Sequence, residues 1–209
     1  MVSVILVVHQ SYLMYLPTVL HSLKDQLEGH ELIIVANGCQ VDMPEAISIP
    51  ETNLATACNI GVNASNGEYI VRIDADDWVD AEFIQLESEY LDSHPETDAV
   101  WCDYIAAHQQ PTDSGEGCEI FTLENMPQPV LEHACGAMYR RSVFDHLGGY
   151  DEELEFQEGY DFWQRFYKAG YIADHLTKPL YIYRRGHASM STNVQERQKV
   201  RKMLEERYK

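Results

Sequence analysis

The chain has 209 residues, of which 45% are hydrophobic and 23% are charged, and its formal net charge is −19. This is the composition of a folded globular protein, and the length suits one domain with a full hydrophobic core. Such an acidic chain lacks the broad basic surface that binds a phosphate backbone, so nucleic acid is excluded as a partner. We predict a single domain over residues 1–209.

The five cysteines are widely spaced and form no CxxC pair. They indicate neither a zinc site nor a disulfide framework, and reduced thiols fit the cytoplasm best. The first apolar run, residues 2–8, is too short to cross a membrane and lacks the flanking signals of a secretory leader. We expect a cytoplasmic protein that contacts the inner face of the membrane at its periphery at most.

Strand and helix patterns alternate in the first part of the chain. Apolar runs rich in β-branched residues predict buried strands at 2–8 and 31–35, and leucines at helical spacing between residues 13 and 27 predict a helix. A second helix over 53–65 leads through a turn into a third strand. This alternation predicts parallel strands with right-handed crossovers, whose ligands lie beyond the strands' carboxyl ends.

The second part of the chain has a more irregular pattern. The expected elements are helices over 80–92 and 158–169, strands over 98–105, 134–139 and 180–184, a short helix that begins at Ser142, and a basic helix after residue 192.

The third strand ends in three carboxylates, Asp74, Asp76 and Asp77. Because side chains alternate along a strand, Asp74 and Asp76 should point to the same side. A hard divalent cation that also binds substrate phosphates commonly relieves the repulsion between two such charges. The alternative is a solvated acidic turn in which Asp80 caps the next helix.

Six segments, in this order and spacing, cover nearly the whole chain: VSVILVVHQ, ELIIVANGC, NLATACNIGVNASNGEYIVRIDADDWVD, GAMYRRSVFDHLGGYDEEL, EGYDFWQRF and LYIYRRGHASMS. With these segments the chain resembles the inverting GT-A glycosyltransferases of family 2. The resemblance implies an α/β fold, the GT-A three-layer α/β/α sandwich with a mostly parallel central sheet. It also implies that residues 1–97 bind the nucleotide sugar and residues 98–209 bind the acceptor.

The same resemblance implies a nucleotide-diphosphate sugar donor, a glycan or glycolipid acceptor, and Mg²⁺ or Mn²⁺. A divalent cation would neutralise the charge that develops on the leaving diphosphate. A carboxylate would take the proton of the acceptor hydroxyl, and displacement from the opposite face inverts the sugar. Such enzymes build polysaccharides or glycolipids, and the basic C-terminal helix would supply any peripheral membrane contact.

The resemblance also assigns roles to residues. Asp76 is the chief metal ligand, Asp74 contacts the ribose or the metal's waters, Asp77 supports them, and His187 binds the metal or the diphosphate. The residues expected to bind the donor are Val8, His9, Asn37, Asn59, Asp74, Arg184 and Arg185. For the histidine and the two arginines, the alternative is an ordinary surface position.

Some positions depart from the family pattern. Ala36 stands where the family has an acidic residue that bonds uracil, and Cys58 stands where it often has arginine, so a uridine donor does not follow from the sequence. Gly159 occupies the usual position of the catalytic base, which leaves Glu158 or Asp161 as substitutes. We expect Asp161 to be the base; alternatively, it complements the helix dipole.

Two other functions remain open. A sugar-nucleotide pyrophosphorylase would need a glycine-rich basic loop after the first strand, where this chain has His9-Gln10-Ser11-Tyr12. A non-catalytic relative that binds a nucleotide or glycan is consistent with the departures from the family pattern.

Overall fold

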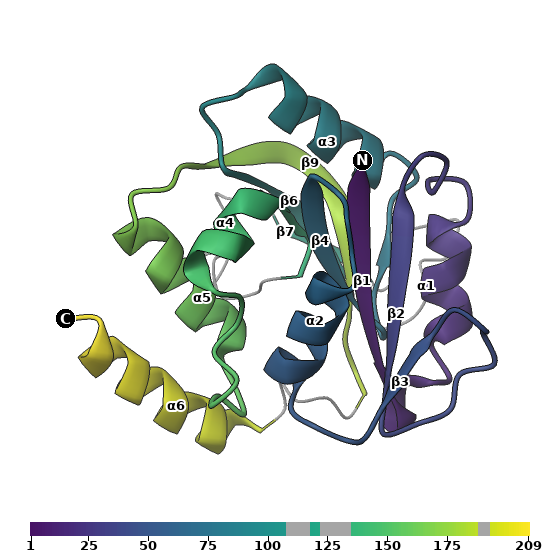
Figure 1. Cartoon of the computed structure of the whole chain (residues 1–209), viewed down its shortest axis with the longest axis horizontal. Coiled ribbons are helices and arrows are strands. Elements are labelled where there is room, and N and C mark those ends of the chain that lie inside the picture. The colour runs from purple at the N-terminus through teal and green to yellow at the C-terminus, as the bar shows by residue number, and fades with distance from the viewer. Residues whose placement is uncertain (108–117, 122–134, 188–192) are drawn as a thin grey trace.

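The computed structural model describes residues 1–107, 118–121, 135–187 and 193–209 (Figure 1). Within these ranges the strands are β1 Val2–His9, β2 Glu31–Asn37, β3 Ile47–Ile49, β4 Tyr69–Asp74, β5 Trp78–Val79, β6 Ala99–Ala107, β7 Cys118–Phe121, β8 Ala137–Arg140 and β9 Ala173–Arg184. The α-helices are α1 Leu16–Leu23, α2 Leu54–Asn63, α3 Phe83–Ser93, α4 Arg141–Leu147, α5 Glu158–Lys168 and α6 Val194–Arg207, and Gln10–Tyr12 form a 3₁₀ turn.

The described strands form one nine-stranded sheet in the order β3-β2-β1-β4-β8-β6-β9-β5, with β7 beside β6. Strands β3, β2, β1 and β4 run parallel to one another, and β6 runs parallel to β9. The remaining pairs are antiparallel. The parallel part is the alternating half of the sequence, where helices α1 and α2 supply the crossovers that parallel strands require.

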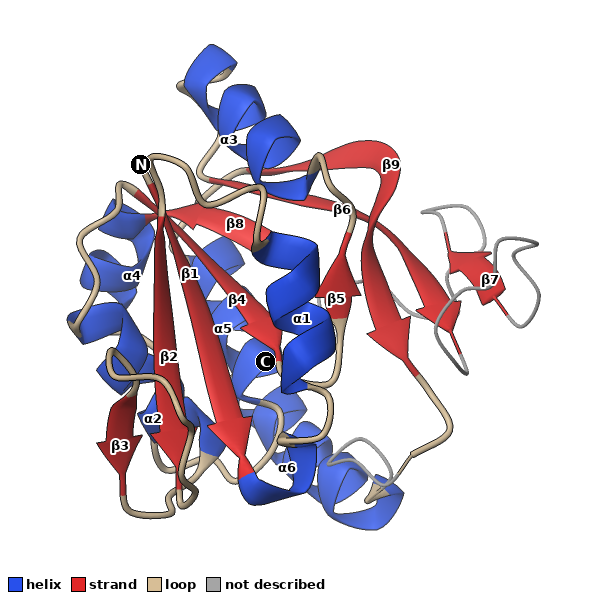
Figure 2. Cartoon of the chain, turned by 90° about the vertical axis from the view of Figure 1, so that its right-hand side faces the viewer, coloured by secondary structure: helices blue, strands red, loops and turns tan. Residues whose placement is uncertain are grey.

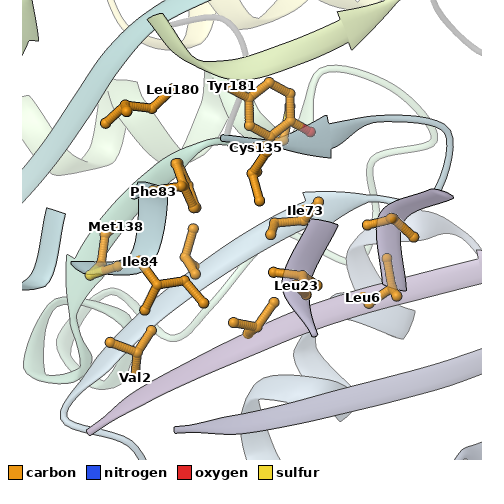
Figure 3. Packing of buried hydrophobic residues seen from close by; sticks show 14 of the residues in the cluster. Val2, Leu6, Leu23, Ile73, Phe83, Ile84, Cys135, Met138, Leu180 and Tyr181 are labelled. Atoms are coloured by element: carbon orange, nitrogen blue, oxygen red, sulfur yellow. The ribbon is translucent and has the colours of Figure 1, made fainter. Parts of the chain in front are cut away.

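Helices cover both faces of the sheet (Figure 2). Alternate residues of β1 point to opposite faces, since Val4 and Leu6 belong to the core cluster shared with α1 and α3, whereas Ile5 and Val7 belong to the cluster shared with α2, α4 and α5. Figure 3 shows the first of these clusters, in which Leu23 of α1 and Phe83 of α3 are fully buried. The predicted three-layer α/β/α fold is confirmed.

The largest difference from the sequence prediction is the length of the last strand. Strand β9 begins at Ala173, seven residues before the predicted start at Leu180. Its first part carries exposed polar residues and Pro179, which do not read as a buried strand. The extension exists because β9 pairs in parallel along the whole of β6, with a break in register at Asp103.

Candidate active site

The strands β1, β2 and β4 end at the same edge of the sheet, where His9 pairs with Asn37 and Val7 pairs with Asp74. A cleft of about 370 Å³ opens at this edge. Its walls come from the ends of these strands, the turn after β4, the segment before α2, the start of α5, Tyr183 of β9 and Arg197 of α6. The location is the one expected for ligands of a parallel α/β sheet.

Asp74 and Asp76 both line the cleft, but a turn places them there. Strand β4 ends at Asp74, and the N–H of Asp77 donates to the carbonyl of Asp74 over 3.1 Å. Our prediction that strand alternation aligns the two side chains was therefore wrong in its reason, since Asp76 lies beyond the last residue of the strand.

Asp76 and His187 are in direct contact. Asp76 Oδ2 and His187 Nε2 lie 2.6 Å apart, although 111 residues separate them in the sequence. Burial raises the pKa of the Asp76 carboxyl, and the negative charge of Asp74 raises it further. His187, in the segment after β9, therefore contacts the acidic turn, by which we mean residues 74–77.

Asp77 points away from solvent and holds the turn to β9. Its Oδ2 accepts the Tyr181 hydroxyl over 2.7 Å, and its Oδ1 accepts the N–H of Arg184 over 2.8 Å. The side chain is fully buried. This burial raises the pKa of the Asp77 carboxyl well above its usual value, and the negative charges of Asp76 and Asp74 raise it further. Asp77 therefore supports the site by fixing the turn to β9.

The two carboxylates of the turn that line the cleft have the donor chemistry that magnesium or manganese requires. The carboxylates of Asp74 and Asp76 are oxygen donors of the kind that Mg²⁺ and Mn²⁺ favour. The ring nitrogen Nδ1 of His187 is buried and has no hydrogen-bond partner in the part of the chain that the structure describes. A contact of 2.6 Å with a carboxylate oxygen requires a proton on Nε2, so His187 donates to Asp76 and the lone pair of Nδ1 is the one left for a cation.

Among the described residues, the candidate ligands whose donor atoms all lie within 4.8 Å of one another are Asp74, Asp77 and Cys135, whereas those of Asp74, Asp76 and His187 are not gathered so closely. Cys135 and Tyr181 are adjacent in Figure 3. Burial raises the pKa of the Cys135 thiol well above its usual value, with a further contribution from Asp74. Mg²⁺ and Mn²⁺ prefer oxygen to sulfur ligands, so for these two ions we favour Asp74 and Asp76, with His187 in contact with Asp76 over 2.6 Å.

Arg184, the last residue of β9, and the following Arg185 both contact other parts of the protein. The Arg184 guanidinium lies 4.6 Å from the ring centres of both Tyr15 and Trp78, and its Nε donates to the carbonyl of Asp76. The N–H of Arg185 donates to the carbonyl of Ala107, and its side chain interacts with the Tyr104 hydroxyl. Neither arginine lines the cleft, so a diphosphate contact stays a prediction for both.

Glu158 lies in the wall of the cleft. It is the first residue of α5, and its Oε1 accepts from Arg72 Nη1 over 2.8 Å. The Nε of the same arginine donates to Asp74 Oδ1, also over 2.8 Å. The Arg72 side chain is only 7% exposed, so one buried guanidinium links the acidic turn to Glu158.

Asp161 does not reach the cleft, and this corrects our expectation that it is the base. Its side chain is 0% exposed, Oδ2 accepts from Arg165 Nε, and Oδ1 accepts from the Tyr208 hydroxyl and from Arg207. A carboxylate without solvent access, with both oxygens engaged, cannot take a proton from an acceptor in the cleft. Of the two predicted bases, only Glu158 lies in the cleft wall.

Among the predicted donor-binding residues, His9 and Asn37 line the cleft. His9 Nδ1 contacts Ser11 Oγ over 2.8 Å. Both side-chain atoms of Asn37 bond the backbone of Thr52 over 2.9 Å, which fixes the segment before α2.

Val8 and Asn59 do not line the cleft. Val8 is fully buried in the core, and the adjacent Val7 takes the position in the cleft wall. Asn59 of α2 bonds the N–H and the carbonyl of Tyr150, each over 2.9 Å. This asparagine therefore holds the loop before α5.

Helix α6 packs against the region of α5, as Figure 1 shows. Leu204 is fully buried beside Leu154 and Tyr160, and the Arg201 guanidinium lies 3.4 Å from the ring centre of Tyr160. The apolar side of this helix is thus used inside the protein. Among the described residues, no helix is long and apolar enough to cross a membrane.

Sequence reasoning missed Arg72, Cys135 and Arg197, which all line the cleft. A signal existed for Arg72 alone, since a charged residue inside an apolar strand run needs a buried ionic partner. Cys135 and Arg197 come from segments whose position beside the cleft depends on the tertiary fold.

Residues 3–148 match the model of the family described as Glycosyl transferase family 2. The chain is 27% identical to EpsH of Bacillus subtilis (strain 168), named as a glycosyltransferase, over 88% of this chain and 60% of EpsH. It is 26% identical to EpsJ of the same organism, also named as a glycosyltransferase, over 66% of this chain and 44% of EpsJ. The chain thus spans about 60% or less of the length of these relatives.

The crystal structure of S. aureus TarS 1-349 in complex with UDP-GlcNAc is similar in fold, with a TM-score of 0.73 and 15% sequence identity. The similarity covers 92% of this chain and 60% of TarS 1-349. The complex of TarS 1-349 with UDP gives a TM-score of 0.68. The family match extends over more than half of the chain and agrees with the fold, and we conclude that this protein belongs to glycosyl transferase family 2 and has the GT-A fold.

Proposed function

We propose that this protein is a metal-dependent, inverting glycosyltransferase that moves a sugar from a nucleotide diphosphate to a hydroxyl of a glycan or glycolipid. The observation that carries the proposal is the composition of one cleft, which Asp74, Asp76 and Glu158 all line. The membership of the chain in family 2 and the UDP-GlcNAc bound by TarS support a nucleotide-sugar donor.

Asp74, Asp76 and His187 would hold Mg²⁺ or Mn²⁺ beside the donor's diphosphate. When bound, the cation neutralises the charge that develops on the leaving diphosphate. His9 and Asn37, which line the cleft at the ends of β1 and β2, would contact the nucleoside portion. Ala36, near the end of β2, has no polar side chain, so it cannot make the hydrogen bond to uracil that is typical of the family.

Glu158 would act as the general base. Glu158 lines the cleft, and its carboxylate would accept the proton of an acceptor hydroxyl while that oxygen attacks the anomeric carbon. Attack from the face opposite the diphosphate inverts the configuration of the sugar. Because Glu158 precedes Gly159, the base lies one residue before the position that the family pattern predicts.

Nucleotide binding tests the donor half of this proposal. We expect UDP or another nucleoside diphosphate to raise the unfolding temperature only when Mn²⁺ is present, since a ligand at a hundred times its dissociation constant adds about 2.7 kcal/mol of stability. Asp76→Asn should abolish this metal-dependent shift and leave the unliganded protein folded. An unchanged shift in Asp76→Asn would contradict the proposed site.

Release of sugar from the donor tests the catalytic half. We expect the protein to hydrolyse or transfer the sugar of at least one member of a panel of UDP-, GDP- and dTDP-sugars in the presence of Mn²⁺. Metal-dependent binding without turnover of any donor, across a broad acceptor panel, would instead identify a non-catalytic nucleotide-binding relative.

A further inference from the structure

Arg72 occupies an unusual position for a cation. It lies in the middle of the apolar run of β4, and its side chain is only 7% exposed. A buried guanidinium is costly unless carboxylates close by compensate its charge. Here two carboxylates do so, because Asp74 Oδ1 lies 2.8 Å from Nε and Glu158 Oε1 lies 2.8 Å from Nη1.

The two carboxylates come from different parts of the fold, and both line the cleft. Asp74 belongs to the turn that would hold the metal, whereas Glu158 begins α5, 86 residues beyond Arg72. A guanidinium is planar and presents its N–H groups at fixed angles. Two charge-assisted hydrogen bonds from one rigid group therefore fix the position of Glu158 relative to the acidic turn.

We propose that Arg72 is a positioning residue for glycosyl transfer, which sets the base Glu158 at its working distance from the donor held at Asp74. This inference rests on the proposed function. The guanidinium touches neither reacting atom in this account and acts through the two carboxylates that it binds. Since displacement of a catalytic group by about 1 Å can cost 10²-fold in rate, loss of this link should be visible in kcat.

The test compares Arg72→Met and Arg72→Lys with a matched control, Arg141→Met. Arg141 is also partly buried and bonds Ser65 Oγ over 2.7 Å and the Gly67 carbonyl, but it does not line the cleft. We expect Arg72→Met to lower kcat about 10²-fold, with the KM for the donor changed by less than about threefold. The kcat of Arg72→Lys should lie between those of the parent and of Arg72→Met, because lysine keeps the positive charge but lacks the planar guanidinium.

The control should lose stability and keep its kcat. If Arg72→Met fails to fold, the comparison of Arg72→Lys with Arg141→Met decides the question. A kcat at the parent level in a folded Arg72→Lys and Arg72→Met protein would overturn the inference.

A double-variant comparison separates positioning from a general structural role. If Arg72 acts through Glu158, then adding Arg72→Met to Glu158→Gln should lower kcat by less than about threefold more, because the group that it positions is already inactive. A further fall as large as that in the parent background would overturn the inference and leave the proposed function standing. Absence of turnover in the parent protein would overturn the proposed function and this inference with it.

Discussion

The Tyr208 hydroxyl donates a hydrogen bond to Asp161 Oδ1 across 47 residues of sequence, and this contact ties helix α6 to helix α5. The neighbouring Arg207 bonds the same oxygen over 3.4 Å and Asp151 over 2.8 Å. Asp161, which we expected to be the base, is thus the centre of a buried polar cluster between α5 and α6.

The first prediction follows from this cluster. Asp161→Ala should lower the free energy of unfolding by about 3 kcal/mol, because it leaves Arg165 and Tyr208 without their acceptor. The kcat of the folded variant should stay within a few-fold of the parent. Urea unfolding and donor turnover measure the two effects, with Asp145→Ala on the exposed side of α4 as the control. A loss of kcat with unchanged stability would show that Asp161 is catalytic after all.

How far the sequence predicts the site depends on the kind of contact involved. The acidic turn was predictable because three carboxylates follow an apolar strand, and a parallel sheet brings such strand ends to one edge. The role of Asp161 was not, because the first turn of a helix gives the same acidic pattern whether its side chain faces a cleft or a covering helix. Asp161 is covered by residues at the end of α6, 46 and 47 positions later in the sequence, and the local pattern does not show this contact.

The fold was more predictable than the site, because the spacing of hydrophobic residues along the sequence indicates directly which side chains are buried. Residues 2–8 and 31–35 form β1 and β2 as expected. The short strands β3 and β5, of three and two residues, carry too few side chains to show a period. Contacts such as that of His187 with Asp76 depend on loops, whose course the local sequence does not determine.

The second prediction concerns His187. His187→Ala should raise the Mn²⁺ concentration needed for half-maximal nucleotide binding, since Asp76 loses the imidazole that lies 2.6 Å away. The control is His175→Ala, which breaks a pair with Asp103 at 2.7 Å; neither of these two residues lines the cleft, whereas Asp76, the partner of His187, does. Calorimetric titration with Mn²⁺ and UDP gives the comparison. Equal metal requirements in the two variants would contradict a role for His187 at the metal.

The third prediction concerns the stability of the protein as a function of pH. Glu87 of α3 is fully buried, and neither carboxylate oxygen has a hydrogen-bond partner of ordinary geometry among the described residues. Burial raises its pKa well above the usual value, and the Cys102 thiol offsets this in part. A carboxyl whose pKa is raised by folding stabilises the protein fully below its unfolded pKa of about 4.3, and this contribution falls as pH rises toward the folded pKa.

Glu87→Gln keeps the neutral form at every pH. We therefore expect Glu87→Gln and the parent to unfold at similar temperatures near pH 4, whereas at pH 8 the variant should be more stable by about 1–3 kcal/mol. Thermal unfolding at the two pH values measures the difference, with Glu89→Gln on the exposed side of the same helix as the control. A variant less stable than the parent at pH 8 would show that the carboxylate has a favourable partner.

The turnover of Glu158→Gln tests the central claim most directly. We predict that this variant binds nucleoside diphosphate and Mn²⁺ as tightly as the parent, while its rate of sugar transfer or donor hydrolysis falls about 10²–10⁴-fold, as expected for loss of a general base. Asp161→Ala, measured beside it, should retain the parent's rate when folded. Turnover of Glu158→Gln at the parent level would contradict the assignment of Glu158 as the base of this cleft.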